Sequence, residues 1–115
     1  IIVVEDSIVR GTTSRSRMQE LRNVGVKEIH MRISCPPIMS PCFYGIDFPS
    51  KGELIAHNKT VQEIADFIKV DSLGFLSLDG MLGVMKKPGS FCSACFTGKY
   101  PVDIPKNSDK LRLES

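Results

Sequence analysis

The feature that most constrains the fold of this chain is its first segment, IIVVEDSIVRGTTS. Ile1 to Val4 is apolar without alternation, which predicts a buried strand of a parallel sheet. A loop with Gly11 follows, and a helical pattern then begins that we expect Thr12 or Thr13 to cap. Backbone N–H groups at such a helix start are unpaired, and the helix dipole attracts an anion. The segment therefore predicts an α/β fold with a phosphate-binding loop.

Two adjacent acids, Glu5 and Asp6, separate the strand from this loop. Carboxylates repel a phosphate, but they suit sugar hydroxyls or a hydrated Mg²⁺. A ligand with a phosphate at one end and a diol with a metal at the other is phosphoribosyl pyrophosphate (PRPP). The alternative is an ordinary strand–turn–helix with polar residues at the turn.

The segment resembles the PRPP motif of type I phosphoribosyltransferases, in which a strand, two acids and three residues precede Thr-Gly-x-Thr. Arg10 replaces the first Thr, and SIVRGTTS is the form found in amidophosphoribosyltransferases; Glu5 departs from the usual Asp pair. The resemblance implies no catalytic residue in this chain, with Mg²⁺ placed by the two acids. It implies a PRPP site made of Glu5, Asp6, Ser7, Arg10, Gly11, Thr12, Thr13 and Ser14.

Composition limits the alternatives. The chain has 115 residues, 42% of them hydrophobic, and a net charge of +2. This charge is too small to indicate nucleic acid or a membrane surface as partner, and no apolar run has the length of a membrane span. The sequence begins within a strand, without an initiator Met or a secretory signal, so we expect a fragment of a larger protein with about three strands.

The next segments predict a right-handed strand–helix–strand unit. The helix is expected to reach Asn23, with Gly25 at its C-terminal cap. Residues 27–33 alternate, with Ile29, Met31 and Ile33 on one side, and are expected to form the next strand. The expected inner stripe of the helix is Met18, Leu21 and Val24, and its solvated face is Arg15, Arg17, Glu20 and Arg22.

Three regions follow from this division: residues 1–34 as part of the phosphoribosyltransferase core, 35–105 as a helical and cysteine-bearing segment, and 106–115 as a disordered tail. Within the second region Ser50 is expected to cap a helix over 52–57, and Thr60 to open a helix to Ile68 through a capping box. A short strand over 73–76 and a helix from Ser77 to Met85 follow, and the rest is expected to be loop.

Four cysteines are present: Cys35, Cys42, Cys92 and Cys95. The chain lacks the loop-dense character of a disulfide-rich secreted domain, so free thiols or metal ligands are favoured. The C-x₂-C spacing of Cys92 and Cys95 lets two thiolates bind one metal from a single turn, although chance or a redox pair would explain it too.

The sequences CSACFTGKYPVDI, SPCFYGID and KGELIAH resemble amidophosphoribosyltransferases of the iron–sulfur type. The resemblance implies a 4Fe-4S cluster held by Cys42, Cys92 and Cys95, with a fourth cysteine from a region upstream of this chain. Cys35 is expected to be a buried small residue and not a ligand. The cluster would hold the proline-rich C-terminal segment against the rest of the domain.

The family reaction takes glutamine, PRPP and water to 5-phosphoribosylamine, pyrophosphate and glutamate. The resemblance implies that an N-terminal glutaminase domain, absent here, supplies the ammonia, and that the fragment alone is inactive. It further implies a homo-oligomer, inhibition by purine nucleotides, and a cytoplasmic location, or a plastid one for a plant protein.

Three alternatives remain. A salvage phosphoribosyltransferase, which uses a purine or pyrimidine base, would have no use for the cysteine segments. A nucleotide-binding regulator with this fold would not need an intact acid pair. In a small cluster or zinc module the PRPP motif would be incidental.

Overall fold

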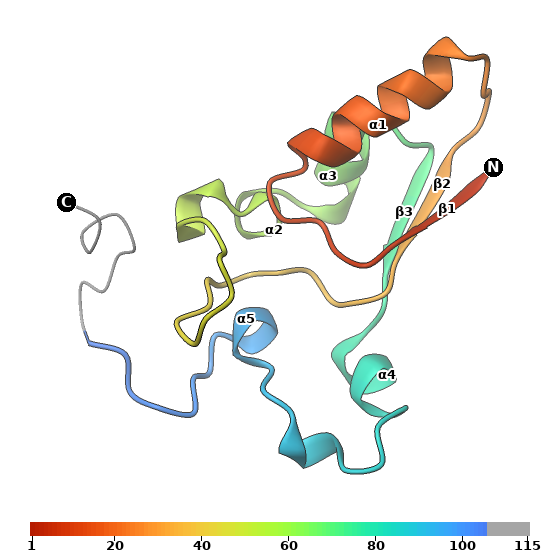
Figure 1. Ribbon diagram of the computed structural model, residues 1–115. Helices are drawn as coiled ribbons and strands as arrows, with labels where there is room; N and C mark the ends of the chain where they lie inside the picture. The colour runs from red at the N-terminus through yellow and green to blue at the C-terminus, as the bar shows by residue number, and fades with distance from the viewer. Residues whose placement is uncertain (106–115) are drawn as a thin grey trace.

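The computed structural model describes residues 1–105, and the predicted disordered tail lies outside these residues. Three parallel strands form one sheet in the order β1 (Ile2–Glu5), β2 (His30–Ile33) and β3 (Ser72–Phe75) (Figure 1). The expected parallel α/β fold is confirmed. The helices are α1 (Thr12–Asn23), η1 (Lys51–Glu53), α2 (Ile55–Asn58), α3 (Val61–Ile68), α4 (Leu78–Leu82), η2 (Pro88–Ser90) and α5 (Ala94–Thr97).

The hydrophobic core lies between one face of the sheet and the helices α1 and α3, which contact each other. Met31 and Ile33 of β2 point into it, as the alternating pattern predicted. Met18 of α1 meets Ile64 and Ile68 of α3 there. Both crossover helices thus cover the same face.

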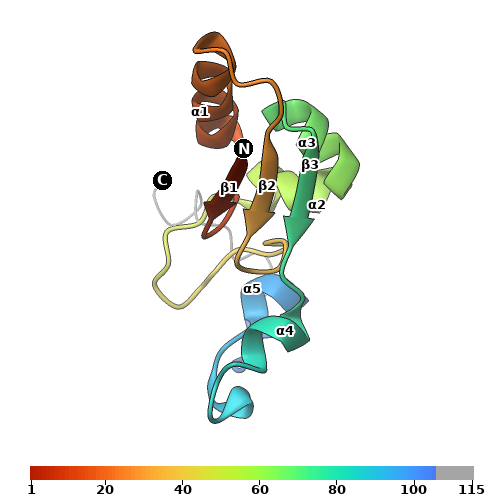
Figure 2. The ribbon, with the colours of Figure 1, turned by 90° about the vertical axis from the view of Figure 1, so that its right-hand side faces the viewer.

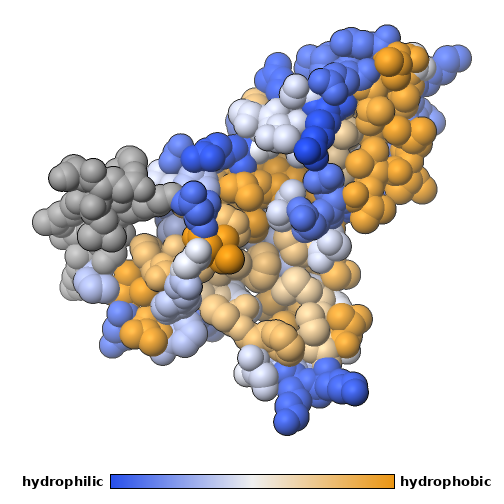
Figure 3. Space-filling model, viewed as in Figure 1, coloured by the Kyte–Doolittle hydropathy of each residue, from blue (hydrophilic) through white to orange (hydrophobic). Residues whose placement is uncertain are grey.

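The other face of the sheet is open in this chain. The register aligns Ile2 with His30 and Ser72, and Val4 with Arg32. Ile2 is 74% exposed and Val4 70% exposed, so the prediction of a strand buried on both faces is wrong for these residues. The physical reason is that α1 and α3 both pack on the opposite face. Figure 3 shows the resulting apolar surface on the side where Figure 1 places β1.

Helix α1 ends as predicted but begins differently. Gly25, with φ 100°, donates its N–H to Arg22 O, and Val26 donates to Leu21 O, which is a Schellman cap. At the other end the N-cap is Gly11 and no side chain caps the helix, so the expectation of a threonine cap is wrong. Val24 is 79% exposed and leaves the predicted inner stripe, because it lies at the C-cap where the helix unwinds.

The second half of the chain combines confirmed and corrected elements. Thr60 and Glu63 form the expected capping box of α3. The helix expected over 52–57 is divided by Leu54, whose backbone is extended and whose side chain is fully buried. Helix α4 ends at Leu82, before the predicted Met85, in a stretch with Gly80 and Gly83 that favours helix poorly.

The region from Lys86 onward was expected to be loop, but η2 and α5 form there. Figure 2 shows the three strands side by side, with α4 and α5 beyond their carboxyl ends. The phosphate loop leaves β1 at this same end of the sheet. The acid pair and the cysteine-bearing turn therefore share one end of the sheet, where parallel α/β proteins place their ligands.

Candidate phosphate-binding loop and cysteine cluster

The loop between β1 and α1 is held in place by contacts with the hydrophobic core and with α2. Ile8 is 3% exposed and belongs to the hydrophobic core. The carbonyl of Val9 accepts a hydrogen bond of 3.0 Å from the Ile55 N–H at the start of α2. These two contacts fix the loop before it reaches the helix.

Gly11 is required at the top of the loop for two reasons. Its φ of 83° lies in the left-handed region that favours glycine. A Cβ atom there would lie 2.7 Å from Ile55 Cδ1 and 3.3 Å from Phe67 Cε1. The tight packing of this turn against α2 and α3 was not visible in the local sequence, because both partners lie more than forty positions away.

The loop encloses a hollow of about 220 Å³. Among the residues that the structure describes, no backbone acceptor pairs with the N–H groups of residues 7–14, so these donors remain free for an anion. All the predicted PRPP residues except Asp6 line this hollow, and the sequence analysis missed three further lining residues, Ile8, Val9 and Arg17.

Two cationic side chains flank the hollow. Arg10 lies 3.4 Å from Glu53, and Arg17 lies 3.6 Å from Glu5. Asp6, outside the lining, is exposed and accepts a hydrogen bond of 3.1 Å from the Ser7 hydroxyl. The guanidinium groups compensate the acids and leave the loop itself suited to an anion.

Arg15, Arg17 and Glu20 are exposed on α1, as the predicted solvated face requires, whereas Arg22 is half-buried, and each arginine has a partner. Arg15 lies over the ring of Phe67, with 4.8 Å from its Cζ to the ring centroid. Arg17 pairs with Glu5. The Arg22 guanidinium donates hydrogen bonds to groups that lie just before β2 and β3. These groups are the carbonyls of Lys27 and Lys69 and the carboxylate of Asp71.

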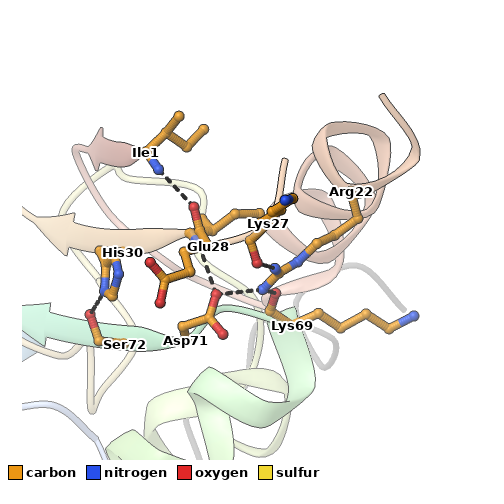
Figure 4. Close-up of polar contacts among 9 residues, drawn as sticks. Ile1, Arg22, Lys27, Glu28, His30, Lys69, Asp71 and Ser72 are labelled. Atoms are coloured by element: carbon orange, nitrogen blue, oxygen red, sulfur yellow. Dashed lines mark hydrogen bonds and ion pairs between the residues drawn. The ribbon is translucent and has the colours of Figure 1, made fainter. Parts of the chain in front are cut away.

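Asp71 is the centre of the Arg22 contacts (Figure 4). Its carboxylate accepts hydrogen bonds of 2.8 Å from Arg22 and 2.8 Å from the Ile29 N–H. The Ile29 N–H and then Arg22 lower the pKa of Asp71 below its usual value. Arg22 also donates to the carbonyls of Lys27 and Lys69, so this network joins α1 to the starts of β2 and β3.

The four cysteines are free thiols in this structure. Burial raises the pKa of Cys95, and the nearby Cys42 and Cys92 raise it further. Burial, then Cys95 and Asp6, raise the pKa of Cys35 to about 11. Cys95 is therefore within electrostatic reach of all three other thiols. Within residues 1–105 no group of three or more His, Cys, Asp or Glu side chains is arranged as a metal site.

The donor chemistry nevertheless fits an iron–sulfur cluster in part. Thiols are the ligands that such clusters use, and Cys42 accepts a hydrogen bond from the Tyr44 N–H at 3.3 Å. Cys42, Cys92 and Cys95 come from two segments far apart in sequence. Three such donors leave one ligand position of a four-cysteine site to be filled.

Tyr100 fastens the C-terminal segment to the Cys42 loop. Its hydroxyl donates to the Pro41 carbonyl at 2.7 Å. Its ring meets Phe43 with centroids 5.2 Å apart and Tyr44 at 6.1 Å. The sequence shows aromatic residues in both segments, in CFY and in KYP, but only the fold shows that they contact each other.

The three-stranded parallel sheet and its helices match part of the fold of two solved structures. Glutamine PRPP amidotransferase from B. subtilis, in complex with ADP and GMP, matches 93% of this chain and 25% of its own with a TM-score of 0.82 and 48% identity. The solved allosteric regulatory enzyme of purine biosynthesis matches equally well, with a TM-score of 0.82.

Sequence relatives agree. Amidophosphoribosyltransferase from Synechocystis is 55% identical over 100% of this chain and 24% of its own length. The protein of the same name from Methanocaldococcus jannaschii is 53% identical over 96% of this chain and 23% of its own length. A chloroplastic amidophosphoribosyltransferase from Glycine max is 51% identical over 98% of this chain and 20% of its own length. No family model matches.

The chain belongs to the amidophosphoribosyltransferase family, of whose members it spans about a quarter. No helix within residues 1–105 is long and apolar enough to cross a membrane.

Proposed function

We propose that this chain forms the PRPP-holding and cysteine-bearing part of an amidophosphoribosyltransferase. The observation that carries the proposal is the loop of residues 7–14, whose free N–H groups surround a hollow at the N-terminus of α1. In the full enzyme, ammonia from glutamine displaces pyrophosphate from PRPP. The ammonia comes from an N-terminal glutaminase domain outside this chain.

The 5′-phosphate of PRPP binds at Arg10 to Ser14. Backbone N–H groups and the hydroxyls of Thr12, Thr13 and Ser14 donate to its oxygens, and the helix dipole adds to the attraction. Arg10 and Arg17 contribute positive charge at the rim.

Glu5 and Asp6 hold the ribose diol and place Mg²⁺. Glu5 ends β1 and Asp6 follows it, so both acids lie at the same end of the sheet as the phosphate loop. When bound, Mg²⁺ would neutralise charge on the leaving pyrophosphate. The task of this chain is to hold PRPP in line with the incoming ammonia, which removes the entropic cost of their encounter.

Cys42, Cys92 and Cys95 provide three ligands of a 4Fe-4S cluster, and a cysteine upstream of this chain provides the fourth. When bound, the cluster would tie the C-terminal segment to the Cys42 loop, beside the Tyr100 contacts. Cys35 is the nearest alternative, because it lies within electrostatic reach of Cys95. The Cys35 side chain is half-buried and packs against the hydrophobic core, which favours a structural role over ligation.

The assembly is a homo-oligomer inhibited by purine nucleotides; the B. subtilis relative was solved with ADP and GMP. The location is the cytoplasm, or the plastid in a plant, as for the chloroplastic relatives.

The test uses the full-length enzyme and measures pyrophosphate release with ammonia as donor. Thr13→Ala combined with Ser14→Ala should raise the KM for PRPP about tenfold or more, since two hydrogen bonds to a charged phosphate are lost. Ser16→Ala is the matched control, because Ser16 is exposed on α1 and does not line the hollow. An unchanged KM in the double variant would refute the phosphate assignment, and transfer to a purine or pyrimidine base instead of ammonia would point to a salvage enzyme.

A further inference from the structure

Residues Ser34–Ser40, which we call the connecting segment, run between the acid pair and the cysteine-bearing turn. At its first end both donors of Ser34 bind the Glu5 carbonyl, the backbone N–H at 2.9 Å and the hydroxyl at 3.3 Å. This carbonyl belongs to the peptide bond that joins Glu5 to Asp6. The two hydrogen bonds therefore fix the peptide plane from which the Asp6 side chain departs.

The other end of the connecting segment is held by the cysteine-bearing turn. The N–H groups of Met39 and Ser40 both donate to the Cys95 carbonyl, at 2.9 Å and 3.0 Å. Cys95 lies on α5, only three residues from Cys92. Any change in the conformation of the C-x₂-C turn thus acts directly on two adjacent amides of the segment.

The connecting segment is short and stiff between these ends. Pro36 and Pro37 fix two of its φ angles. Pro36, Ile38 and Ser40 are buried, so the segment is also packed against its surroundings. A stretch of seven residues spans at most about 25 Å, which limits the slack that could absorb a displacement.

We propose that the connecting segment couples the two sites, so that ligation of the cysteines sets the affinity for Mg²⁺–PRPP by positioning Asp6. The inference rests on the proposed function and goes beyond it, because it makes residues without substrate contact determine substrate binding. Coupling between sites requires a contiguous element that both sites influence, and the segment is bonded to both.

The first experiment makes the connecting segment of the full-length enzyme more flexible by combining Pro36→Gly with Pro37→Gly. The KM for PRPP should rise about fivefold, at the lower end of couplings between sites, while kcat changes less than about twofold. Iron content should stay that of the wild type. Pro105→Gly is the matched control, since Pro105 is exposed and lies ten positions beyond Cys95, and it should alter neither quantity.

The deciding experiment is a double-mutant cycle on the dissociation constant of Mg²⁺–PRPP, measured by calorimetry without turnover. Cys92→Ser alone should raise the dissociation constant about fivefold. In the Pro36→Gly, Pro37→Gly background the same substitution should raise it by less than about 1.5-fold. Equal weakening in both backgrounds, or none in either, overturns the proposal. Failure of the wild type to bind Mg²⁺–PRPP would instead overturn the proposed function.

If the proline double variant loses its iron or does not fold, a second variant tests the same proposal. Ser34→Ala should raise the dissociation constant of Mg²⁺–PRPP, and Ser34→Thr should restore it because the hydroxyl is kept. An Ala variant that binds like the wild type refutes the role of Ser34 as a positioning residue, and with it the coupling.

Discussion

Single residues of the loop between β1 and α1 have a role in the fold besides the one proposed in binding. Gly11 allows the left-handed turn and packs against two helices, and in the proposed function it also lets the backbone approach a phosphate. Because Gly11 has both a packing role and a proposed binding role, a kinetic effect of a Gly11 variant would not by itself identify a binding role. A stability measurement separates the two.

Gly11→Ala should lower the unfolding midpoint of the full-length enzyme, because the new Cβ would lie 2.7 Å from Ile55 Cδ1 on a backbone with φ 83°. Strain of this kind costs about 1–3 kcal/mol. Thermal unfolding without substrate checks it. Gly52→Ala is the control, since its Cβ would meet nothing within 4 Å; equal midpoints for the two variants would contradict the packing argument.

Asp6→Asn should keep the fold and lose most of the transfer activity. The side chain is exposed, so the substitution leaves the core untouched, but a neutral amide cannot compensate the charge of Mg²⁺. Pyrophosphate release with ammonia as donor, across a series of Mg²⁺ concentrations, measures the effect. Full activity in the variant would remove Asp6 from the site.

Among the elements, the Arg22–Asp71 network gives a prediction for pH dependence. The folded-state pKa of Asp71 lies below the usual value of 3.8, so its carboxylate stabilises the fold above that pH and the contribution is lost as pH falls through the lower folded pKa. Asp71→Asn should therefore lower the thermal midpoint between pH 5 and pH 7, and the difference from wild type should shrink below about pH 4.

Asp103→Asn, an exposed change away from the network, serves as the control for this series. A constant difference for Asp71→Asn across the whole pH range would show that the hydrogen bonds, and not the charge, matter.

Elements with local signals could be predicted from the sequence. The Schellman glycine at Gly25, the alternation that buries Met31 and Ile33, and the capping box at Thr60 each lie within a few residues of what they determine. Features that depend on distant partners could not. The start of α1 at Gly11 depends on Ile55 and Phe67, and Leu54 divides a helix because its side chain enters the core.

The same distinction applies to the site. The sequence pointed to most residues that line the hollow between β1 and α1, since they are consecutive and their chemistry is local, and their binding role stays a prediction. Arg17 was missed because a helical arginine usually faces solvent, and only the fold brings it to Glu5. The role of Tyr100 depends on a contact with Pro41, 59 positions away.

At the scale of the whole molecule, the full-length enzyme purified without oxygen should be brown and contain about four iron atoms per chain. Cys92→Ser or Cys95→Ser should lose the iron, whereas Cys35→Ser should retain it, because the half-buried Cys35 side chain packs against the hydrophobic core. Iron analysis and visible absorption measure the outcome. Iron that survives both Cys92→Ser and Cys95→Ser would eliminate the C-x₂-C pair as ligands.

The open face of the sheet affects how this piece of chain can be handled in the laboratory. Ile2 and Val4 expose apolar side chains on β1, whose far edge has no neighbouring strand among residues 1–105. Bare strand edges of this kind recruit other copies and favour precipitation. Lysine or threonine at positions 2 and 4 would make this edge less prone to association without changing the core-facing side of β1, so a soluble minimal version of this α/β unit becomes an engineering target.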